Sequence, residues 1–339
     1  MKFFFFHVAL ATATVLPPLC TPPSNPDVDD IHIDCKIDTN MDNSQELTQI
    51  PLFKGDLLTV LEYNIDRNGA GGDGSREAGM DAIVNLLSDS AVLPNFDVLL
   101  LSEVARGCDS WAGGSNGAAV IADHFEGLTN EKYYYAYSVE YVEVGSSSEG
   151  GECTIGNAIV SRYPLNDLNQ VTYESQCCRY GGRWGGRSAV AASVDLGGSS
   201  SGGLVVVSTH LESGQSDIKS VLNGTYVREK QASEITALFP PAGDALTLIG
   251  GDFNSPLRSI DPTRLSFEYH LYHDSHDTMK WRERNTCPDG AIAQYAKALT
   301  LDFIYTSDKG RVKEVGICDD EEKCNGWSDH VPIFAKYSW

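Results

Sequence analysis

The chain has 339 residues, of which 42% are hydrophobic and 21% charged, and its formal net charge is -22 with a pI near 4.6. This composition is typical of a globular protein with one large core or two small ones. A negative field of this size repels polyanions, which disfavours capture of nucleic acid by charge alone. Any phosphate-bearing ligand must therefore be held locally, by cations or by a metal ion.

The first 20 residues resemble an export signal. Lys2 is followed by the apolar run FFFFHVALATATVL and then by Pro17 and Pro18, a length and order typical of a signal peptide and too short to span a bilayer. The alternative is a buried N-terminal strand. We expect a secreted, soluble protein with a signal peptide over 1–20, an acidic and flexible lead-in over 21–54, and a single domain over 55–339.

From residue 57 onward, apolar runs alternate with turn-forming residues. Apolar residues at helical spacing predict helices over 75–90, with Ser75 as a cap, and over 225–239. Strands are predicted at 57–65, 96–104, 133–144, 157–163, 188–196, 204–211, 245–253, 301–307 and 331–337. Many strands too apolar for an exposed sheet, together with few helices, predict sheets packed on each other with helices outside, a layered α/β sandwich.

Eight cysteines follow Cys20, and an even number behind an export signal predicts disulfides. Zinc is the alternative, but the chain has no CxxC spacing and no cysteine and histidine at zinc-finger distances. Cys318 and Cys324 bracket a short polar loop and form the most credible local pair. The other pairings are not readable from the sequence.

Several predicted strands end in an acid, an amide or an imidazole. These residues are Asn64, Glu103, His210, Asp252, Asn254, Asp302, Asp329 and His330. Taken singly, each is more often a cap, a turn or a surface residue, but together they should meet at one rim of a rigid scaffold. Carboxylate and amide oxygens without a thiolate suit Mg²⁺, Mn²⁺ or Ca²⁺. Two imidazoles can supply hydrogen bonds or protons to a phosphoryl transition state, so the combination predicts hydrolysis of a phosphate ester.

The strings YNID, LLLSEV, STHLES, GGDFNS, LDFIY and SDHVPI resemble, in order and spacing, the endonuclease/exonuclease/phosphatase superfamily typified by deoxyribonuclease I. The resemblance extends from about Asp56 to Trp339. It implies a four-layer α/β sandwich with two packed, mainly antiparallel sheets flanked by helices. It also implies a metal-dependent phosphoester hydrolase that uses Mg²⁺ or Mn²⁺, with Ca²⁺ as a further possibility.

The resemblance also implies a role for each matching residue. In the metal site, Glu103 would be the principal carboxylate, Asn64 would lie beside it, and Asp329 would lie in or just behind the site. Asp252 would position or deprotonate the attacking water, and Asn254 would hold the phosphate or the water. The remaining catalytic residues would be His330, which contacts the scissile phosphate, Asp302, which orients its imidazole, and His210, which contacts the phosphate or leaving oxygen. One-metal and two-metal mechanisms both remain open.

The segment QCCRYGGRWGGR places three arginines beside two aromatic residues, with no acid among them. Its cations are Arg179, Arg183 and Arg187, and Arg106 is a fourth candidate phosphate contact. Such a segment can grip a phosphate backbone and stack bases. Alternatively it docks on a lipid headgroup surface through Trp184, or it is a solvated, disulfide-anchored loop.

Three function classes therefore follow from the sequence. The first is a secreted, nuclease-like phosphodiesterase that acts on a phosphodiester of nucleic acid. The second is a sphingomyelinase or phospholipase C-type phosphodiesterase that acts on lipid headgroups. The third is a non-catalytic binding module on the same fold, which the intact set of polar residues argues against. We expect a monomer without a stable protein partner.

Overall fold

The computed structural model describes most of the chain beyond residue 54. The described residues are 38–39, 52, 55–69, 76–108, 115–143, 153–175, 179–180, 183–197, 203–213, 218–241, 243–255, 261–279, 286, 300–320, 324 and 328–339. The expected signal peptide and most of the expected lead-in lie outside them. Within the lead-in, β1 (Asp38–Thr39) pairs with β4, and Leu52 is buried. None of the described helices is long and apolar enough to cross a membrane.

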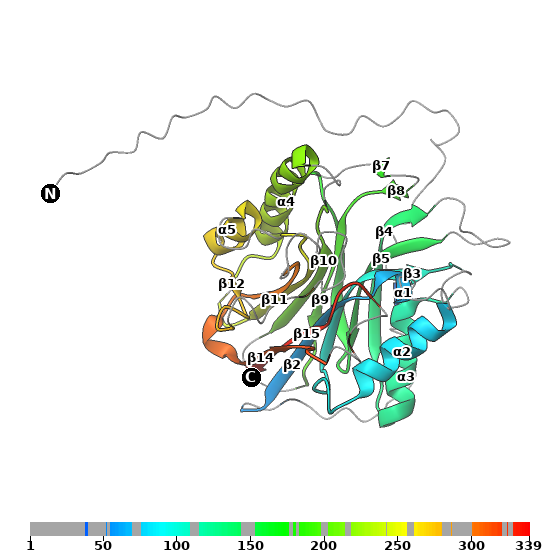
Figure 1. Cartoon of the computed structure of the whole chain (residues 1–339). Coiled ribbons are helices and arrows are strands. Elements are labelled where there is room, and N and C mark those ends of the chain that lie inside the picture. The colour runs from blue at the N-terminus through cyan, green and yellow to red at the C-terminus, as the bar shows by residue number, and fades with distance from the viewer. Residues whose placement is uncertain are drawn as a thin grey trace.

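Two β-sheets form the centre of the fold (Figure 1). Sheet A has the order β14-β15-β2-β3-β5-β4-β8-β7, and β1 is added beside β4. Its strands are β2 (Leu57–Asn64), β3 (Val98–Arg106), β4 (Tyr134–Glu143), β5 (Thr154–Ser161), β7 (Arg179–Tyr180), β8 (Arg183–Gly185), β14 (Val312–Ile317) and β15 (Ile333–Ser338).

Sheet B has the order β12-β13-β11-β10-β9-β6. Its strands are β6 (Leu165–Thr172), β9 (Ser188–Val194), β10 (Leu204–His210), β11 (Leu246–Asp252), β12 (His273–Asp274) and β13 (Asp302–Thr306). Among the described strands, β2 pairs in parallel with β3 and β10 with β11, whereas the other pairings are antiparallel. The prediction of mainly antiparallel sheets is confirmed.

Helices cover the outer face of each sheet, which gives four layers (Figure 1). The helices are α1 (Asp66–Gly69), α2 (Arg76–Ser88), α3 (Gly117–Thr129), α4 (Ile218–Leu238), α5 (Pro262–Tyr269) and the short 3₁₀ helix η4 (Lys309–Arg311). Apolar residues of α2 and α3, such as Ile83 and Ile121, pack on sheet A, and Ile235 of α4 and Phe267 of α5 pack on sheet B. A third apolar core, made by alternate strand residues, lies between the sheets. The predicted four-layer sandwich is confirmed.

The predicted helices and strands are all present, although α4 begins seven residues earlier than predicted. Other elements, such as α5 and β6, were not predicted. α5 has only eight residues, yet it carries the usual start signals, because Asp261 caps it through Thr263 N and a proline stands in its first turn. β6 was missed because it lies at the edge of sheet B, where the sequence LNDLNQVT is half exposed and reads as a polar loop.

The two sheets approach each other closely at the end where the polar strand ends gather. Ser208 Oγ of β10 donates to Leu101 O of β3 at 2.9 Å, and Ser102 Oγ of β3 donates to Thr209 O at 3.3 Å. Gly250 of β11 permits this approach of the sheets, and Gly251 permits close packing of β11 on β10 within sheet B. A Cβ on Gly250 would lie 2.5 Å from Leu100 Cδ1, and a Cβ on Gly251 would lie 1.7 Å from Thr209 O. The GGD sequence therefore reflects close backbone packing at this end.

Two disulfides lie in the described part of the chain. Cys318 pairs with Cys324, as predicted, and Cys108 pairs with Cys153. The second bond joins the end of β3 to the start of β5, which are neighbours in sheet A. The remaining four cysteines of the predicted set, Cys35, Cys177, Cys178 and Cys287, lie outside the described residues.

We predict that Gly251→Ala destabilises the fold by about 3 kcal/mol or more, because the new methyl group would collide with backbone and Gly251 has a φ of 149°. Gly243→Ala is the matched control. Gly243 also has a positive φ, of 54°, but its Cβ position is open, so this change should cost only about 1–2 kcal/mol. Denaturant unfolding of both variants measures the difference, and equal losses would contradict the close approach of β11 and β10.

Candidate active site

Three of the expected residues lie side by side on neighbouring strands of sheet B. β10 and β11 are parallel, and their last residues, His210 and Asp252, are paired in register. β13 runs antiparallel to β11, and its first residue, Asp302, is paired with Asp252 on the other side. Residues paired across neighbouring strands project from the same face of a sheet. All three are 2% exposed, so strand pairing alone brings them into one buried row.

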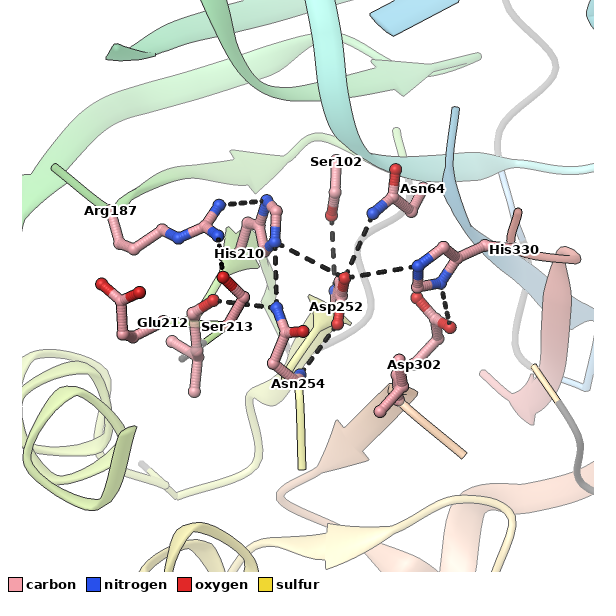
Figure 2. A network of polar contacts seen from close by, with 12 residues as sticks. Asn64, Ser102, Arg187, His210, Glu212, Ser213, Asp252, Asn254, Asp302 and His330 are labelled. Carbon is pink, nitrogen blue, oxygen red and sulfur yellow. Dashed lines mark hydrogen bonds and ion pairs between the residues drawn. The ribbon is translucent and has the colours of Figure 1, made fainter. Parts of the chain in front are cut away.

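The carboxylate of Asp252 is the centre of the polar network (Figure 2). Its Oδ2 accepts a hydrogen bond from Asn64 Nδ2 at 3.1 Å and lies 3.5 Å from His210 Nε2 and 3.6 Å from His330 Nε2. Asn64 is the last residue of β2 in sheet A. Asp252 therefore joins the two sheets and lies between two imidazoles.

Asp302 holds the imidazole of His330 at its Nδ1 atom. The imidazole Nδ1 lies 2.7 Å from Asp302 Oδ2, and both side chains are buried. Ser328 Oγ accepts from His330 N at 3.1 Å and donates to Asn64 O at 2.7 Å, which ties the histidine backbone to β2. Burial opposes the charge on His330, but Asp302 and Asp252 raise its pKa well above the ordinary value. The protein therefore favours the imidazolium form of His330.

His210 has a matching carboxylate on its other side. Glu140 of β4 lies with its Oε2 3.4 Å from His210 Nδ1 and is only 3% exposed. Arg187 forms an ion pair with Glu140, and its Nη1 lies 2.7 Å from His210 Nδ1. Burial opposes ionisation of Glu140, but Arg187 and His210 hold its pKa below the ordinary value. Each histidine thus has a buried carboxylate behind its Nδ1 and Asp252 in front of its Nε2.

Asn254 closes the network beside His210 (Figure 2). Its backbone N–H donates to Asp252 Oδ1 at 2.8 Å, and its Nδ2 donates to Leu211 O at 3.1 Å and lies 3.1 Å from His210 Nε2. Its φ of 48° is in the left-handed region, which asparagine tolerates better than most residues. The structure therefore unites six of the eight strand-end residues, Asn64, His210, Asp252, Asn254, Asp302 and His330, and a seventh, Asp329, lies at the margin with its Oδ1 3.8 Å from His330 Nε2.

Glu103 lies on a β-bulge of β3. Ser102 and Glu103 together face a single residue of β5, Asn157, and Glu103 has a φ of 55°. A bulge alters the alternation of side chains between the two faces, and left-handed backbone at a residue other than glycine is common at functional sites. Glu140 lies on a second bulge, between Val139 and Tyr141 of β4, on the other side of β5.

A left-handed turn follows β2 and faces Glu103. Asp66, Arg67 and Asn68 have φ values of 36°, 56° and 63°. The Asn68 side chain fixes the turn on β3, because its Oδ1 accepts from Ala105 N at 3.0 Å and its Nδ2 donates to Ala105 O at 3.1 Å. Asp66 N donates to Asn64 Oδ1 at 3.0 Å. The turn therefore carries Asp66 to the same side of the site as Glu103.

The carboxylates on the Glu103 side are suited to a divalent cation. Burial and the charge of Glu103 raise the pKa of Asp66. Desolvation raises the pKa of the half-exposed Asp329 to about 6, and the charges of Asp66 and Glu103 act in the same direction. The positive charge of His330 opposes this shift. Such mutual repulsion between oxygen donors is relieved by a hard cation. Glu103, Asp66 and Asp329 offer carboxylates and Asn64 offers an amide oxygen, which are the donor types that such a cation prefers.

Among the residues that the structure describes, the donor atoms that lie close enough together to hold a metal ion are those of Asp252, Asp302 and His330. One donor atom from each lies within 4.8 Å of the others. The closest contact within the group, His330 Nδ1 to Asp302 Oδ2, has the geometry of a hydrogen bond. His330 and Asp302 are therefore suited to proton transfer as well as to metal binding.

The four arginines predicted to bind substrate lie in different places. Arg187 belongs to the histidine network and its Nη2 donates to Ser213 Oγ at 3.3 Å. Arg106, at the end of β3, stacks over the ring of Tyr137, which belongs to the core between sheet A and its helices. Arg179 and Arg183 lie in the β7 and β8 hairpin, which extends sheet A beside β4. Their side chains lie outside what the structure describes.

Sequence reasoning missed three buried residues around the site, Glu62, Glu140 and Asn68. Glu62 interrupts the apolar run LLTVLEYN of a fully buried strand, which is the signal that could have revealed it. The Asn-Gly pair after Arg67 is a usual signal for left-handed backbone. Glu140 gave no such signal, because SVEYVEV alternates like a half-exposed strand.

Comparisons with known proteins agree with this fold. The Endonuclease/Exonuclease/phosphatase family model matches residues 61–330, so the chain belongs to that family. Members of the family hydrolyse phosphoester bonds. No curated protein matches the chain by sequence.

Solved structures share the fold at low sequence identity. An endonuclease/exonuclease/phosphatase family protein from Leptotrichia buccalis C-1013-b is 17% identical with a TM-score of 0.58, over 83% of this chain and 100% of that chain. The beta toxin 275-280 from Staphylococcus aureus is 20% identical with a TM-score of 0.56, over 83% and 100%. D. rerio TDP2 complexed with single strand DNA product is 17% identical with a TM-score of 0.53, over 84% and 99%. These likenesses concern the fold.

Glu62 provides a test of the electrostatics beneath the site. It is fully buried, both carboxylate oxygens lack a hydrogen-bond partner, and burial followed by Asp302 and Asp252 raises its pKa well above 4.5. The folded state therefore binds this proton more tightly than the unfolded state, so Glu62 weakens stability as pH rises above 4.5. Glu62→Gln should raise the melting temperature in metal-free buffer at pH 8.

The gain from Glu62→Gln should shrink toward pH 4, where the carboxyl is protonated in both states. Glu314→Gln serves as the control, because Glu314 is half exposed and pairs with Lys336 at the surface. Thermal unfolding of wild type and both variants at the two pH values measures the effect. A pH-independent gain, or a loss at pH 8, would show that Glu62 is ionised in the folded protein.

Proposed function

We propose that this protein is a secreted, divalent-metal-dependent phosphodiesterase, and that its substrate is a phosphodiester of nucleic acid. The observation that supports it best is the arrangement of two imidazoles around one carboxylate. His210 and His330 both direct Nε2 at Asp252 Oδ2, and each has a buried acid behind its Nδ1. A phosphodiester with an alkoxide leaving group needs one group to activate water and another to protonate or stabilise the leaving oxygen.

The side chains divide these tasks as follows. Asp252, held by Asn64 and Asn254, orients the attacking water and accepts its proton. His330, whose imidazolium form Asp302 favours, donates a hydrogen bond to a non-bridging phosphate oxygen. His210, positioned by Glu140 and Arg187, faces the leaving oxygen. A divalent ion held by Glu103, Asn64, Asp66 and Asp329 would stabilise negative charge on the phosphoryl oxygens.

Secretion is supported by two observations. The apolar leader has the length and order of an export signal. Two disulfides, Cys108 with Cys153 and Cys318 with Cys324, are usual in oxidising compartments.

The location of the basic segment supports a polymeric substrate. The β7 and β8 hairpin is the edge of sheet A next to β4, the strand that carries Glu140. Gly186 N, directly before Arg187, donates to Glu140 O at 3.1 Å. The chain thus runs from the hairpin straight into the histidine network, so a long phosphodiester bound at the network could extend along the hairpin. Elsewhere the net charge of -22 opposes such binding.

A substrate panel tests the proposed function. Plasmid DNA, RNA, sphingomyelin vesicles and a chromogenic phosphodiester are each incubated with the secreted protein, with Mg²⁺ and with excess EDTA. We expect Mg²⁺-dependent cleavage of nucleic acid and of the chromogenic diester, with Glu103→Gln folded but at least about 100-fold slower. Full activity in EDTA would contradict metal dependence. Cleavage of sphingomyelin alone would contradict a nucleic-acid substrate and would show that the enzyme acts on lipid headgroups.

The Asp302 and His330 pair predicts non-additive losses. If Asp302 acts by orienting His330, Asp302→Asn and His330→Ala should each lower kcat about 100-fold or more, the scale of positioned acid and base groups. The double variant should be little slower than the slower single variant. Rates at saturating Mg²⁺ and several pH values measure this. Losses that multiply would give Asp302 a separate role.

Replacement of Arg179 and Arg183 by Ser should weaken the binding of a polyanionic substrate more than the binding of a small chromogenic diester, because only the larger substrate reaches the hairpin. Arg187 is left intact because it contacts Glu140 and His210. KM for both substrates is measured at two salt concentrations, and added salt should reproduce the effect on the long substrate. Equal effects on the two substrates would make the hairpin a structural element.

A further inference from the structure

Arg228 of α4 is a guanidinium in the protein interior. It is 1% exposed and is the largest of the fully buried side chains. Its Nη1 donates to Glu212 O at 2.9 Å and its Nη2 to Thr225 Oγ1 at 3.0 Å, while Nε has no partner. Within the part of the chain that the structure describes, Arg228 forms no direct ion pair, and the carboxylates of Asp261, Glu212 and Asp252 act on it only at longer range. An apolar side chain would pack here without the cost of burying a charge, so helix packing alone does not explain an arginine.

Gln231 lies three residues further on α4 and acts on the same segment. Its Oε1 accepts from Glu212 N at 3.0 Å. Residues three apart on a helix share one face, so Arg228 and Gln231 present a donor and an acceptor together. The two side chains hold the peptide groups on both sides of the Glu212 Cα.

The segment held in this way is part of the active site. Leu211 N donates to Asp252 O at 2.9 Å, and Leu211 O accepts from the Nδ2 of Asn254. Ser213 Oγ accepts from Arg187, which contacts the imidazole of His210. Figure 2 shows Glu212 and Ser213 beside Arg187 and Asn254. The segment Leu211–Ser213 is therefore bonded to the catalytic network on one side and to α4 on the other.

We propose that Arg228 and Gln231 are positioning residues for the hydrolysis proposed above. By holding Glu212, they fix the segment that follows His210 and so set His210 and Asn254 relative to Asp252. The inference rests on the proposed function for its kinetic consequence. Its structural consequence, the position of the His210 imidazole, is independent of any activity. A shift of about 1 Å in such a group is enough to slow a reaction strongly.

A purely structural role for α4 is separated from positioning by a matched control. Ile235 lies on α4, one turn beyond Gln231, is fully buried and packs in the core beneath sheet B. Ile235→Ala should loosen the helix without removing a bond to Glu212. Arg228→Met and Gln231→Leu remove those bonds while retaining similar apolar volume.

The experiment measures three quantities for the wild type and these variants. They are kcat and KM on the chromogenic phosphodiester at saturating Mg²⁺, the melting temperature, and the ¹⁵N signals of His210 in metal-free protein, assigned with His210→Ala. We expect Arg228→Met and Gln231→Leu each to lower kcat about tenfold or more, to leave KM within about twofold, and to shift the His210 signals. The double variant should be little slower than either single variant. Ile235→Ala should lower the melting temperature but keep kcat and the His210 signals.

Wild-type kcat with unshifted His210 signals in Arg228→Met and Gln231→Leu would overturn the proposal. Loss of kcat that follows melting temperature across all three variants would overturn it as well. If Arg228→Met does not fold, Gln231→Leu decides alone, since it removes the other half of the contact with Glu212. A wild type inactive on every phosphodiester would overturn the proposed function, and the His210 signals would still decide the positioning role.

Discussion

The site depends first on the hydrogen bond from Asn64 of sheet A to the Asp252 carboxylate of sheet B. Most of the contact between the sheets is apolar and has no preferred direction, so it fixes the sheets only to within the tolerance of side-chain packing. The directional bonds at this end, from Ser102, Ser208 and Asn64, add the required precision. Asn64 at the end of β2 in sheet A and the row His210, Asp252 and Asp302 in sheet B thereby come together in one polar network.

The arrangement concentrates charge in a buried region, which is costly unless each charge has a partner. Most of these buried charges are paired with a group of opposite charge. Glu140 is paired with Arg187 and His210, and Asp302 with His330. Glu62 is not paired in this way, since neither of its carboxylate oxygens has a hydrogen-bond partner, and burial raises its pKa and so favours the neutral form. Ionisation of Glu62 would therefore destabilise the fold, although its carboxyl group lies close to the charged residues of the site.

Much of the fold and part of the site could be predicted from sequence. Apolar runs that end in a polar residue identified Asn64, His210 and Asp252, because strand ends and their residues are local features. Glu140 and the bulge at Glu103 could not be predicted, since both depend on which strands lie beside β5 and in which register. The same limit applies to Arg187, whose partner Glu140 lies 47 residues away. Pairing between distant strands is decided by the whole core.

The row formed by His210, Asp252 and Asp302 limits how such a protein can change during evolution. A single-residue insertion or deletion inside β10, β11 or β13 would turn one member of the row to the opposite face of the sheet. Changes of length in the connections beyond Ser213 and Asn254 leave the row intact. The connecting segments are therefore free to diverge in length, while the strands preserve the row of polar residues.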